Sequence, residues 1–183
     1  MLFLISLLFS AFLALKIYQY KPPERPLAKE GGSPKGIGGW LILLSVGVLL
    51  SPILNIGHLL ETLPNTLSYN NWLAILDTTL SSFNSVTAPF IIFSLMIDTM
   101  IFIFSVLCVF LFFMKKRIFP YLYISLYLAS SFFLLVDHWV IKHFSLDDLF
   151  DSQPSYITKS ALGIVIWSLY LLKSKRVKAT FIH

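Results

Sequence analysis

Five long stretches of apolar residues constrain the fold of this chain more than any other feature. They cover approximately residues 2–18, 37–56, 89–114, 118–141 and 157–172. A helix rises about 1.5 Å per residue, so about 20 residues cross the roughly 30 Å hydrocarbon core of a bilayer. The middle three stretches reach that length, whereas the first and the fifth are short and would need local thinning or flanking anchors. Because hydrocarbon offers the backbone no hydrogen-bonding partner, we expect each stretch to be a helix.

The composition argues against an ordinary soluble domain. Of the 183 residues, 57% are hydrophobic and 13% are charged, whereas soluble domains average about 45–50% and about 25%. The formal net charge of +5 arises from basic residues that follow the apolar stretches. That placement is typical of a membrane protein, so we expect the lipid bilayer as a partner and no nucleic acid.

The basic residues gather on one side of the predicted helices. All but Lys142 and Lys159 of the 14 lie at the end of the first stretch, in the segment after it, in the joint Lys115–Arg117, or after the fifth stretch. Cytoplasmic loops of membrane proteins carry such an excess of Lys and Arg. The pattern therefore predicts a cytoplasmic C-terminus and an N-terminus on the opposite side.

The same pattern divides the chain into three parts. Residues 1–20 are predicted to form an N-terminal transmembrane anchor helix, which we expect to be retained because its charges follow the apolar run instead of preceding it. Residues 21–35 form a basic cytoplasmic linker rich in Pro and Gly. Residues 36–183 form a four-helix transmembrane domain with an outer loop at 58–88. The predicted fold class is an all-α membrane protein, a bundle of four core transmembrane helices plus an N-terminal anchor helix.

The outer loop is the only sizeable polar region of the predicted domain. Apolar residues recur in it at helical spacing, namely Leu73, Leu76, Leu80 and Phe83. An amphipathic helix with this pattern would lie in the outer interface or cap the bundle. An ordinary ordered loop is the other interpretation, and the sequence leaves both open.

Asp98 is the most informative polar residue because it lies inside the third apolar stretch. An unpaired charge at the bilayer centre costs about 2.5 kcal/mol or more, so Asp98 should face the protein interior and be paired, protonated or near water. Asp137 and His138 lie near the outer end of the fourth stretch, where either could contact Asp98 and form a pair that titrates near neutral pH. Two interpretations stay open: a proton relay, cation relay or helix-docking point, and a carboxyl held by nearby Thr99 or Asn55.

No pattern indicates an enzyme or a bound metal. The sequence shows no nucleophile with a positioned base and no carboxylate pair at catalytic spacing. His58 lies near the depth of His138, but no ligand-spacing motif supports a metal site there. The glycines before Trp40 lack the Gly-Lys-Ser/Thr ending of a phosphate loop. We therefore expect a non-enzymatic protein without a metal or a cofactor.

Several small, proline and tryptophan residues are expected to set helix packing and anchoring. They are Gly36, Gly38, Gly39, Trp40, Gly47, Ser51, Pro52, Pro120 and Trp167. The first three glycines permit close backbone approach, while Trp40 and Trp167 are interface anchors. Gly47 and Ser51 form a small-xxx-small pair that favours tight helix packing. Pro52 should bend or loosen its helix near the outer end.

Three separated motifs stand in order along the chain. They are Gly36–Leu41 leading into Leu50–Pro52, then Arg117–Ile124, and finally Ile166–Tyr170 followed by Ser174–Phe181. Together they resemble a family of bacterial inner-membrane proteins of unknown function, the YdgK-like proteins, over about residues 35–183. The resemblance implies four membrane spans and a bacterial inner-membrane location. It implies no activity.

Two function classes follow from these observations. The small size, the lack of a catalytic set and the extra N-terminal helix favour a subunit or scaffold of a larger membrane assembly, with other membrane-protein subunits as partners. The alternative is a small proton-, ion- or solute-handling membrane protein that uses Asp98, with Asp137 and His138 as helpers. The basic tail would meet anionic headgroups at about 1 kcal/mol per residue or dock a protein; its residues are Lys175, Arg176 and Lys178.

Overall fold

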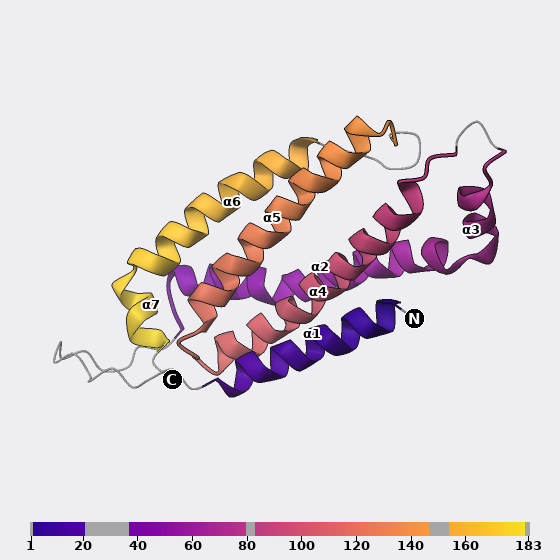
Figure 1. Ribbon diagram of the computed structural model, residues 1–183. Helices are drawn as coiled ribbons and strands as arrows, with labels where there is room; N and C mark the ends of the chain where they lie inside the picture. The colour runs from indigo at the N-terminus through magenta and orange to yellow at the C-terminus, as the bar shows by residue number, and fades with distance from the viewer. Residues whose placement is uncertain (1, 21–36, 80–82, 147–153, 182–183) are drawn as a thin grey trace.

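The computed structural model describes residues 2–20, 37–79, 83–146 and 154–181, whose regular structure is entirely helical. The helices are α1 (Leu2–Gln19), α2 (Trp40–Leu67), α3 (Tyr69–Leu76), α4 (Thr87–Phe113), α5 (Phe119–His143), α6 (Pro154–Lys173) and α7 (Lys175–Thr180). Figure 1 shows α1, α2, α4, α5 and α6 lying side by side as an elongated bundle, with α3 at one end and α7 at the other.

Three of the described helices are long and apolar enough to cross a membrane. They are Trp40–Pro64 within α2, Thr87–Phe113 and Phe119–His143. Shorter apolar helices cover Phe3–Gln19 and Leu162–Lys173, the two stretches that the sequence marked as short. The chain is therefore an all-helical membrane protein, in which lipid can cover the apolar outer faces of the bundle.

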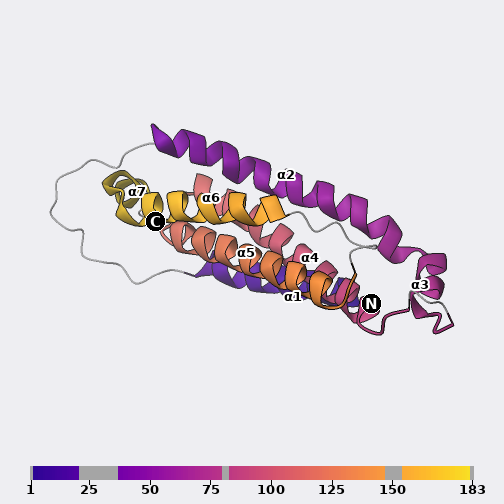
Figure 2. The same ribbon diagram turned by 90° about the horizontal axis from the view of Figure 1, so that it is seen from above.

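Helix α4 is the centre of the bundle. It packs against α1, α2 and α5, while α6 packs against α5 on the outside. Figures 1 and 2 show that α1, α4 and α6 run in one direction and α2 and α5 in the other. Helix α4 is also the most deeply buried of the three long apolar helices. Side chains on several faces of α4 therefore have protein neighbours.

One end of the bundle collects most of the described basic residues. At this end α1, α4 and α6 finish and α2 and α5 begin. We call it the basic end, and its basic residues are Lys16, Lys115, Lys116, Arg117, Lys173, Lys175, Arg176 and Lys178. The fold thus brings together charges that the sequence pattern had placed on one side.

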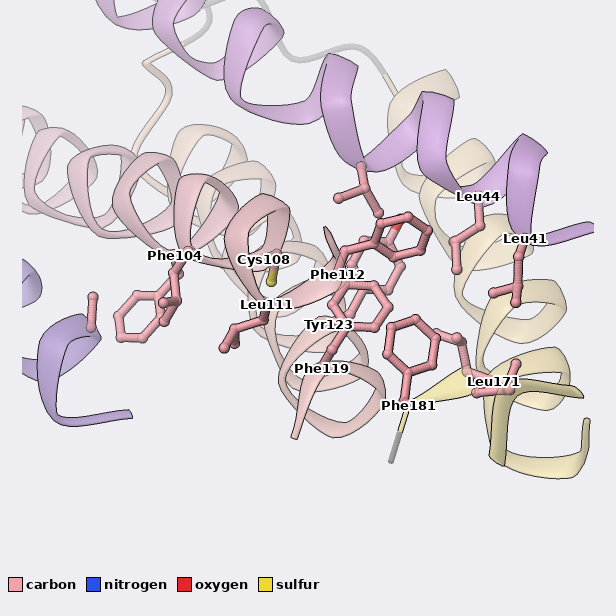
Figure 3. Packing of buried hydrophobic residues seen from close by; sticks show 14 residues of the cluster. Leu41, Leu44, Phe104, Cys108, Leu111, Phe112, Phe119, Tyr123, Leu171 and Phe181 are labelled. Atoms are coloured by element: carbon pink, nitrogen blue, oxygen red, sulfur yellow. The ribbon is translucent and has the colours of Figure 1, made fainter. Parts of the chain in front are cut away.

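The main core occupies the half of the bundle next to the basic end. Its buried members are Ala14, Leu41, Leu44, Val48, Phe104, Leu107, Cys108, Leu111, Phe112, Phe119, Tyr123, Leu171, Val177 and Phe181. Figure 3 shows side chains from α2, α4 and α5 converging on this cluster, together with Phe181 from beyond α7. A smaller cluster of Phe90, Ile141 and Leu146 closes the opposite end.

Helix α2 is longer than its apolar stretch predicts. It continues to Leu67 and remains one helix across Pro52 and Pro64, so Pro52 does not end it. In the polar extension, Thr62 Oγ1 donates to the His58 carbonyl one turn earlier at 2.7 Å, so this hydroxyl finds a partner without ending the helix. Apolar character marks where a helix lies in a membrane, but a helix does not have to stop where that character ends.

Helix α3 is shorter than the predicted amphipathic helix. It ends at Leu76, and the Asp77 side chain then accepts hydrogen bonds from the Thr79 backbone N–H at 2.9 Å and from its hydroxyl at 2.6 Å. This turn competes with continuation of the helix. Phe83 lies beyond the helix, and Leu80 lies outside the described residues. The apolar spacing is therefore realised as a helix only in its first half.

Candidate functional site

Four polar side chains join α2, α4 and α5 in the half of the bundle away from the basic end. His58 Nδ1 on α2 lies 3.6 Å from Asp98 Oδ2 on α4. Ser94 Oγ, one turn earlier on α4, donates a hydrogen bond to Asp137 Oδ1 on α5 at 3.5 Å. Asp137 is also close enough to interact electrostatically with Asp98 and His58. We call His58, Ser94, Asp98 and Asp137 the polar cluster.

The polar cluster lies deep along the helices when measured from the basic end. At 1.5 Å per residue, Asp98 is about 22 Å from the end of α4 at Phe113, and His58 is about 27 Å from the start of α2. A hydrocarbon core about 30 Å thick would then place the cluster in its far half. The His58 side chain is 64% exposed and that of Asp98 is 30% exposed. His58 is therefore the more exposed of the two paired side chains.

The partner of Asp98 differs from the partners considered in the sequence. The sequence predicts Asp137 or His138 on the fourth stretch as the partner. The structure puts Asp137 nearby, but the imidazole that pairs with Asp98 belongs to His58 on α2. His138 follows Asp137 directly, and adjacent helical side chains point about 100° apart. The described residues contain no group of three or more His, Cys, Asp or Glu side chains placed to hold a metal.

The chemistry available to the polar cluster is proton exchange. The His58 imidazole and the Asp98 carboxyl are close enough to form an ion pair when the imidazole carries a proton, and Asp137 lies near both. In a membrane, a lone carboxylate such as Asp98 is costly, and a nearby imidazolium offsets part of that cost. A proton gained or lost by the His58–Asp98 pair would therefore change the charge at the contact between α2 and α4.

The glycines before α2 meet the basic tail at the basic end. The Arg176 guanidinium lies over Gly38 and Gly39, so that a side chain built on Gly38 would collide with it. Gly39 has φ +59°, a conformation that favours glycine. Ser174 Oγ starts α7 by accepting a hydrogen bond from the Val177 N–H at 3.4 Å. The first and third sequence motifs thus contact each other, although Gly36 lies outside the described residues.

The second motif contacts the third through an aromatic ring, that of Phe119. The Phe181 ring stacks on Phe119 with a centroid distance of 4.9 Å and packs against Phe112 at 5.6 Å. Pro120 is buried in the first turn of α5. We call Gly38, Gly39, Phe112, Phe119, Arg176 and Phe181 the basic-end latch. The latch ties α7 to the start of α2 and to the joint between α4 and α5.

Other predicted anchoring residues lie around the latch. Trp40 is exposed on the bundle surface, as suits an interface anchor. Trp167 packs against the core and its ring meets that of Tyr170 edge-on at 6.2 Å. Lys175 and Lys178 are exposed beside Arg176. These positions leave Lys175 and Lys178 facing headgroups or solvent, whereas the Arg176 guanidinium lies against Gly38 and Gly39.

Gly47 does not pack as the small-xxx-small pattern predicts. A side chain built on Gly47 would meet no heavy atom within 4 Å in the described structure. The residues of α2 that face α4 and the core here are Leu44 and Val48. Gly47 therefore lies beside the packed stripe of α2, and Ser51 is half-buried.

The sequence analysis missed a small-residue stripe on α1. Ser6, Ser10 and Ala14 are all buried, with Ser10 only 1% exposed, and they face α4. Ser6 Oγ donates a hydrogen bond to the Met96 carbonyl at 3.1 Å. The spacing of four residues between these small side chains was the available signal. Helix α1 is thus packed against the bundle and is more than a membrane anchor.

Comparison with known proteins gives one match. A family model described as "Protein of unknown function (DUF2569)" matches residues 34–182. No curated protein and no solved structure matches the chain. The matched range and the unknown function agree with what the three motifs implied, while the narrower YdgK-like name stays a prediction. Helix α1 lies outside the matched range.

Proposed function

The chain belongs to the DUF2569 family of proteins of unknown function, and we propose that it binds and releases protons, or a small cation, at the polar cluster of α2, α4 and α5. The observation that carries the proposal is the pair formed by His58 and Asp98 at 3.6 Å, with Asp137 beside it. Ionisable residues inside membrane spans are rare and usually mark ion or proton sites. Here three of them come from three different helices.

The arrangement of the two halves of the bundle favours binding from one side. The polar cluster occupies the half away from the basic end, and the other half is filled by the main core, including Phe104, Leu107 and Leu111. His58 is the exposed member of the cluster. Protons would therefore enter and leave at the side opposite the basic end. Their binding would change the charge at the contact between α2 and α4, so we propose a sensing or gating role for this site.

The membrane arrangement that goes with this proposal follows the positive-inside rule. We propose that α2, α4, α5 and α6 are four core spans and that α1 is a fifth, in a bacterial inner membrane with the basic end in the cytoplasm. Helix α1 runs parallel to α4 and finishes at the basic end, which supports a periplasmic N-terminus and a cytoplasmic C-terminus. The polar cluster would then face the periplasm.

Infrared difference spectroscopy tests the proposed proton site directly. Spectra of the purified protein in mild detergent would be compared at about pH 5 and about pH 8, the range in which histidine and coupled carboxylates change charge. We expect carbonyl-stretch bands of protonated carboxylic acids that change with pH. Asp98→Asn and Asp137→Asn should each remove one band and move the titration midpoint of the other, because the two groups are coupled. His58→Gln should move both midpoints.

Asp77→Asn is the matched control. It makes the same chemical change at a fully exposed carboxylate in the turn after α3, so the bands of the polar cluster should stay unchanged. If the spectra of Asp98→Asn, Asp137→Asn and wild type show the same pH-dependent bands, the proposed site is wrong. Circular dichroism of each variant checks that the helical fold is retained.

The sequence also favoured a subunit or scaffold of a larger assembly, and that stays a prediction. Helices α2 and α6 expose rows of large apolar side chains, such as Ile53, Leu54 and Ile166. Lipid covers such faces without any protein partner. The polar cluster is a more specific feature than these exposed apolar faces, so we assign the proposed function to the cluster. The proposal requires no enzymatic step and no cofactor.

A further inference from the structure

Helix α1 is attached to the rest of the molecule through one principal interface. Its main packing partner is α4, and the chain between α1 and α2 spans residues 21–36, which are rich in Pro, Gly and charge. The family match begins only at residue 34. Helix α1 therefore lies outside the family match and is held mainly against one helix of the matched domain.

The interface has the features that hold two helices together in lipid. Lipid tails are as apolar as leucine, so helices associate through close packing and interhelical hydrogen bonds. Ser6, Ser10 and Ala14 form a buried stripe of small side chains that lets the two backbones approach. Large apolar residues such as Leu8 and Phe12 are exposed on the other faces of α1. Only one face of α1 therefore packs against protein, and its other faces are apolar and exposed.

Polar contacts fix the register of α1 at both ends of this interface. Ser6 Oγ donates to the Met96 carbonyl at 3.1 Å in the half away from the basic end. At the basic end, the Tyr18 hydroxyl contacts Met114 Sδ at 3.2 Å, and Lys116 Nζ lies over the Tyr18 ring at 5.7 Å from its centroid. These contacts align α1 parallel to α4. A helix inserted in the opposite direction would lose all of them.

We infer that the α1-facing side of α4 is a binding site for a single transmembrane helix, and that α1 is its resident ligand. The interface holds α1 in place without help from the covalent linker. The site accepts a parallel helix with small residues at every fourth position, including the α1 of a second copy of this chain. This inference does not depend on the polar cluster, because the stripe of α1 contains neither of its carboxylates.

Cleavage of the linker in the intact protein tests the inference. A protease site is placed within residues 21–35, the full-length protein is purified in mild detergent, and the linker is cut. Size-exclusion chromatography then shows whether α1 stays with the domain. We expect the cleaved α1 to co-elute with residues 37–183, and a fluorescently labelled peptide of residues 1–20, added in excess, to be captured by exchange.

Two altered peptides show whether the small-residue stripe carries the binding. In the Ser10→Leu peptide, a large side chain replaces the most deeply buried residue of the stripe, and overpacking of this kind corresponds to about 5- to 140-fold weaker capture. The Leu8→Phe peptide adds bulk on the exposed face of α1 and should be captured like wild type. Because only the added peptide changes, the protein that receives it keeps its native fold.

Each outcome decides the inference. Co-elution of the cut helix, with capture of the wild-type and Leu8→Phe peptides and weak capture of Ser10→Leu, supports it. Loss of wild-type α1 after cleavage overturns it, because the linker is then what holds the helix. Equal capture of the Ser10→Leu and wild-type peptides, or capture of neither, overturns the assignment of the binding site to the α1-facing side of α4.

Discussion

Gly39, which caps α2, and Gly47, which lies within α2, give a sharp test of the basic-end latch. Replacing each by alanine should change the free energy of unfolding in opposite directions. Gly39 caps α2 with φ +59° and ψ −135°. Alanine rarely adopts this conformation, and holding it there costs about 1–3 kcal/mol. The new methyl group would also lie 3.3 Å from Arg176 Nη1. That end of a flexible side chain can move, so the backbone conformation supplies most of the cost.

Gly47→Ala provides the matched comparison. Gly47 lies within α2, and a methyl group there meets nothing within 4 Å. Alanine favours the interior of a helix over glycine by up to about 1 kcal/mol. We therefore expect Gly47→Ala to leave stability unchanged or raise it slightly, and Gly39→Ala to lower it. The two variants should differ by about 1–4 kcal/mol in the free energy of unfolding.

Unfolding in mixed micelles of a mild detergent and dodecyl sulfate, followed by circular dichroism, measures both free energies under the same conditions. The wild type and Gly57→Ala, whose new methyl group also meets nothing within 4 Å, complete the set. If Gly39→Ala and Gly47→Ala agree to within about 0.5 kcal/mol, the usual spread for neutral surface substitutions, the strain assigned to residue 39 is absent. The latch would then not depend on a glycine at that position.

Two further predictions concern the last turn at the basic end and the turn after α3 at the opposite end. Phe181→Ala should weaken docking of the last turn by about 3–5 kcal/mol, since the ring is 3% exposed and stacks on Phe119; faster amide hydrogen exchange in α7 measures this, with the exposed Phe110→Ala as control. Hydrogen bonds from the Thr79 hydroxyl and backbone hold the pKa of Asp77 below its ordinary 3.8. The turn is therefore stabilised above that pH and loses the stabilisation as the pH falls through the lowered pKa. Thr79→Val should bring the pKa of Asp77 part of the way back toward 3.8, which carboxyl NMR titration measures; an unchanged value would contradict the assigned bond.

The helical membrane architecture was predictable from the sequence because it depends on the length and polarity of continuous runs. Three long apolar helices and two shorter ones lie where the five stretches predicted. The extension of α2 to Leu67 was not predictable from hydropathy, since the hydroxyl groups of Thr62 and Thr66 bond to the preceding turn of backbone without ending the helix. The length of α3 depended on a local turn at Asp77, which apolar spacing does not reveal.

The candidate site was predicted in part. Asp98 and Asp137 were identified because ionisable residues within apolar runs are costly and therefore informative. Their neighbour His58 was assigned only to a similar depth, because choosing between His58 and His138 requires the rotation of each helix about its axis. That rotation is set by packing between helices. The stripe on α1, centred on Ser10, was visible as a spacing of four but had no known partner until α4 was placed beside it.

The basic-end latch also determines when the domain can finish packing during synthesis. Gly38 is made near the beginning of the family domain and Arg176 near its end, yet the two residues are in contact. A growing chain therefore cannot close the latch until residue 181 has been made. Until then Phe112 and Phe119 lack the ring of Phe181 and present an apolar surface of the kind that chaperones and proteases act on. A product that stops after α6 but before residue 181 would keep helices α1 to α6 and would still expose this apolar surface.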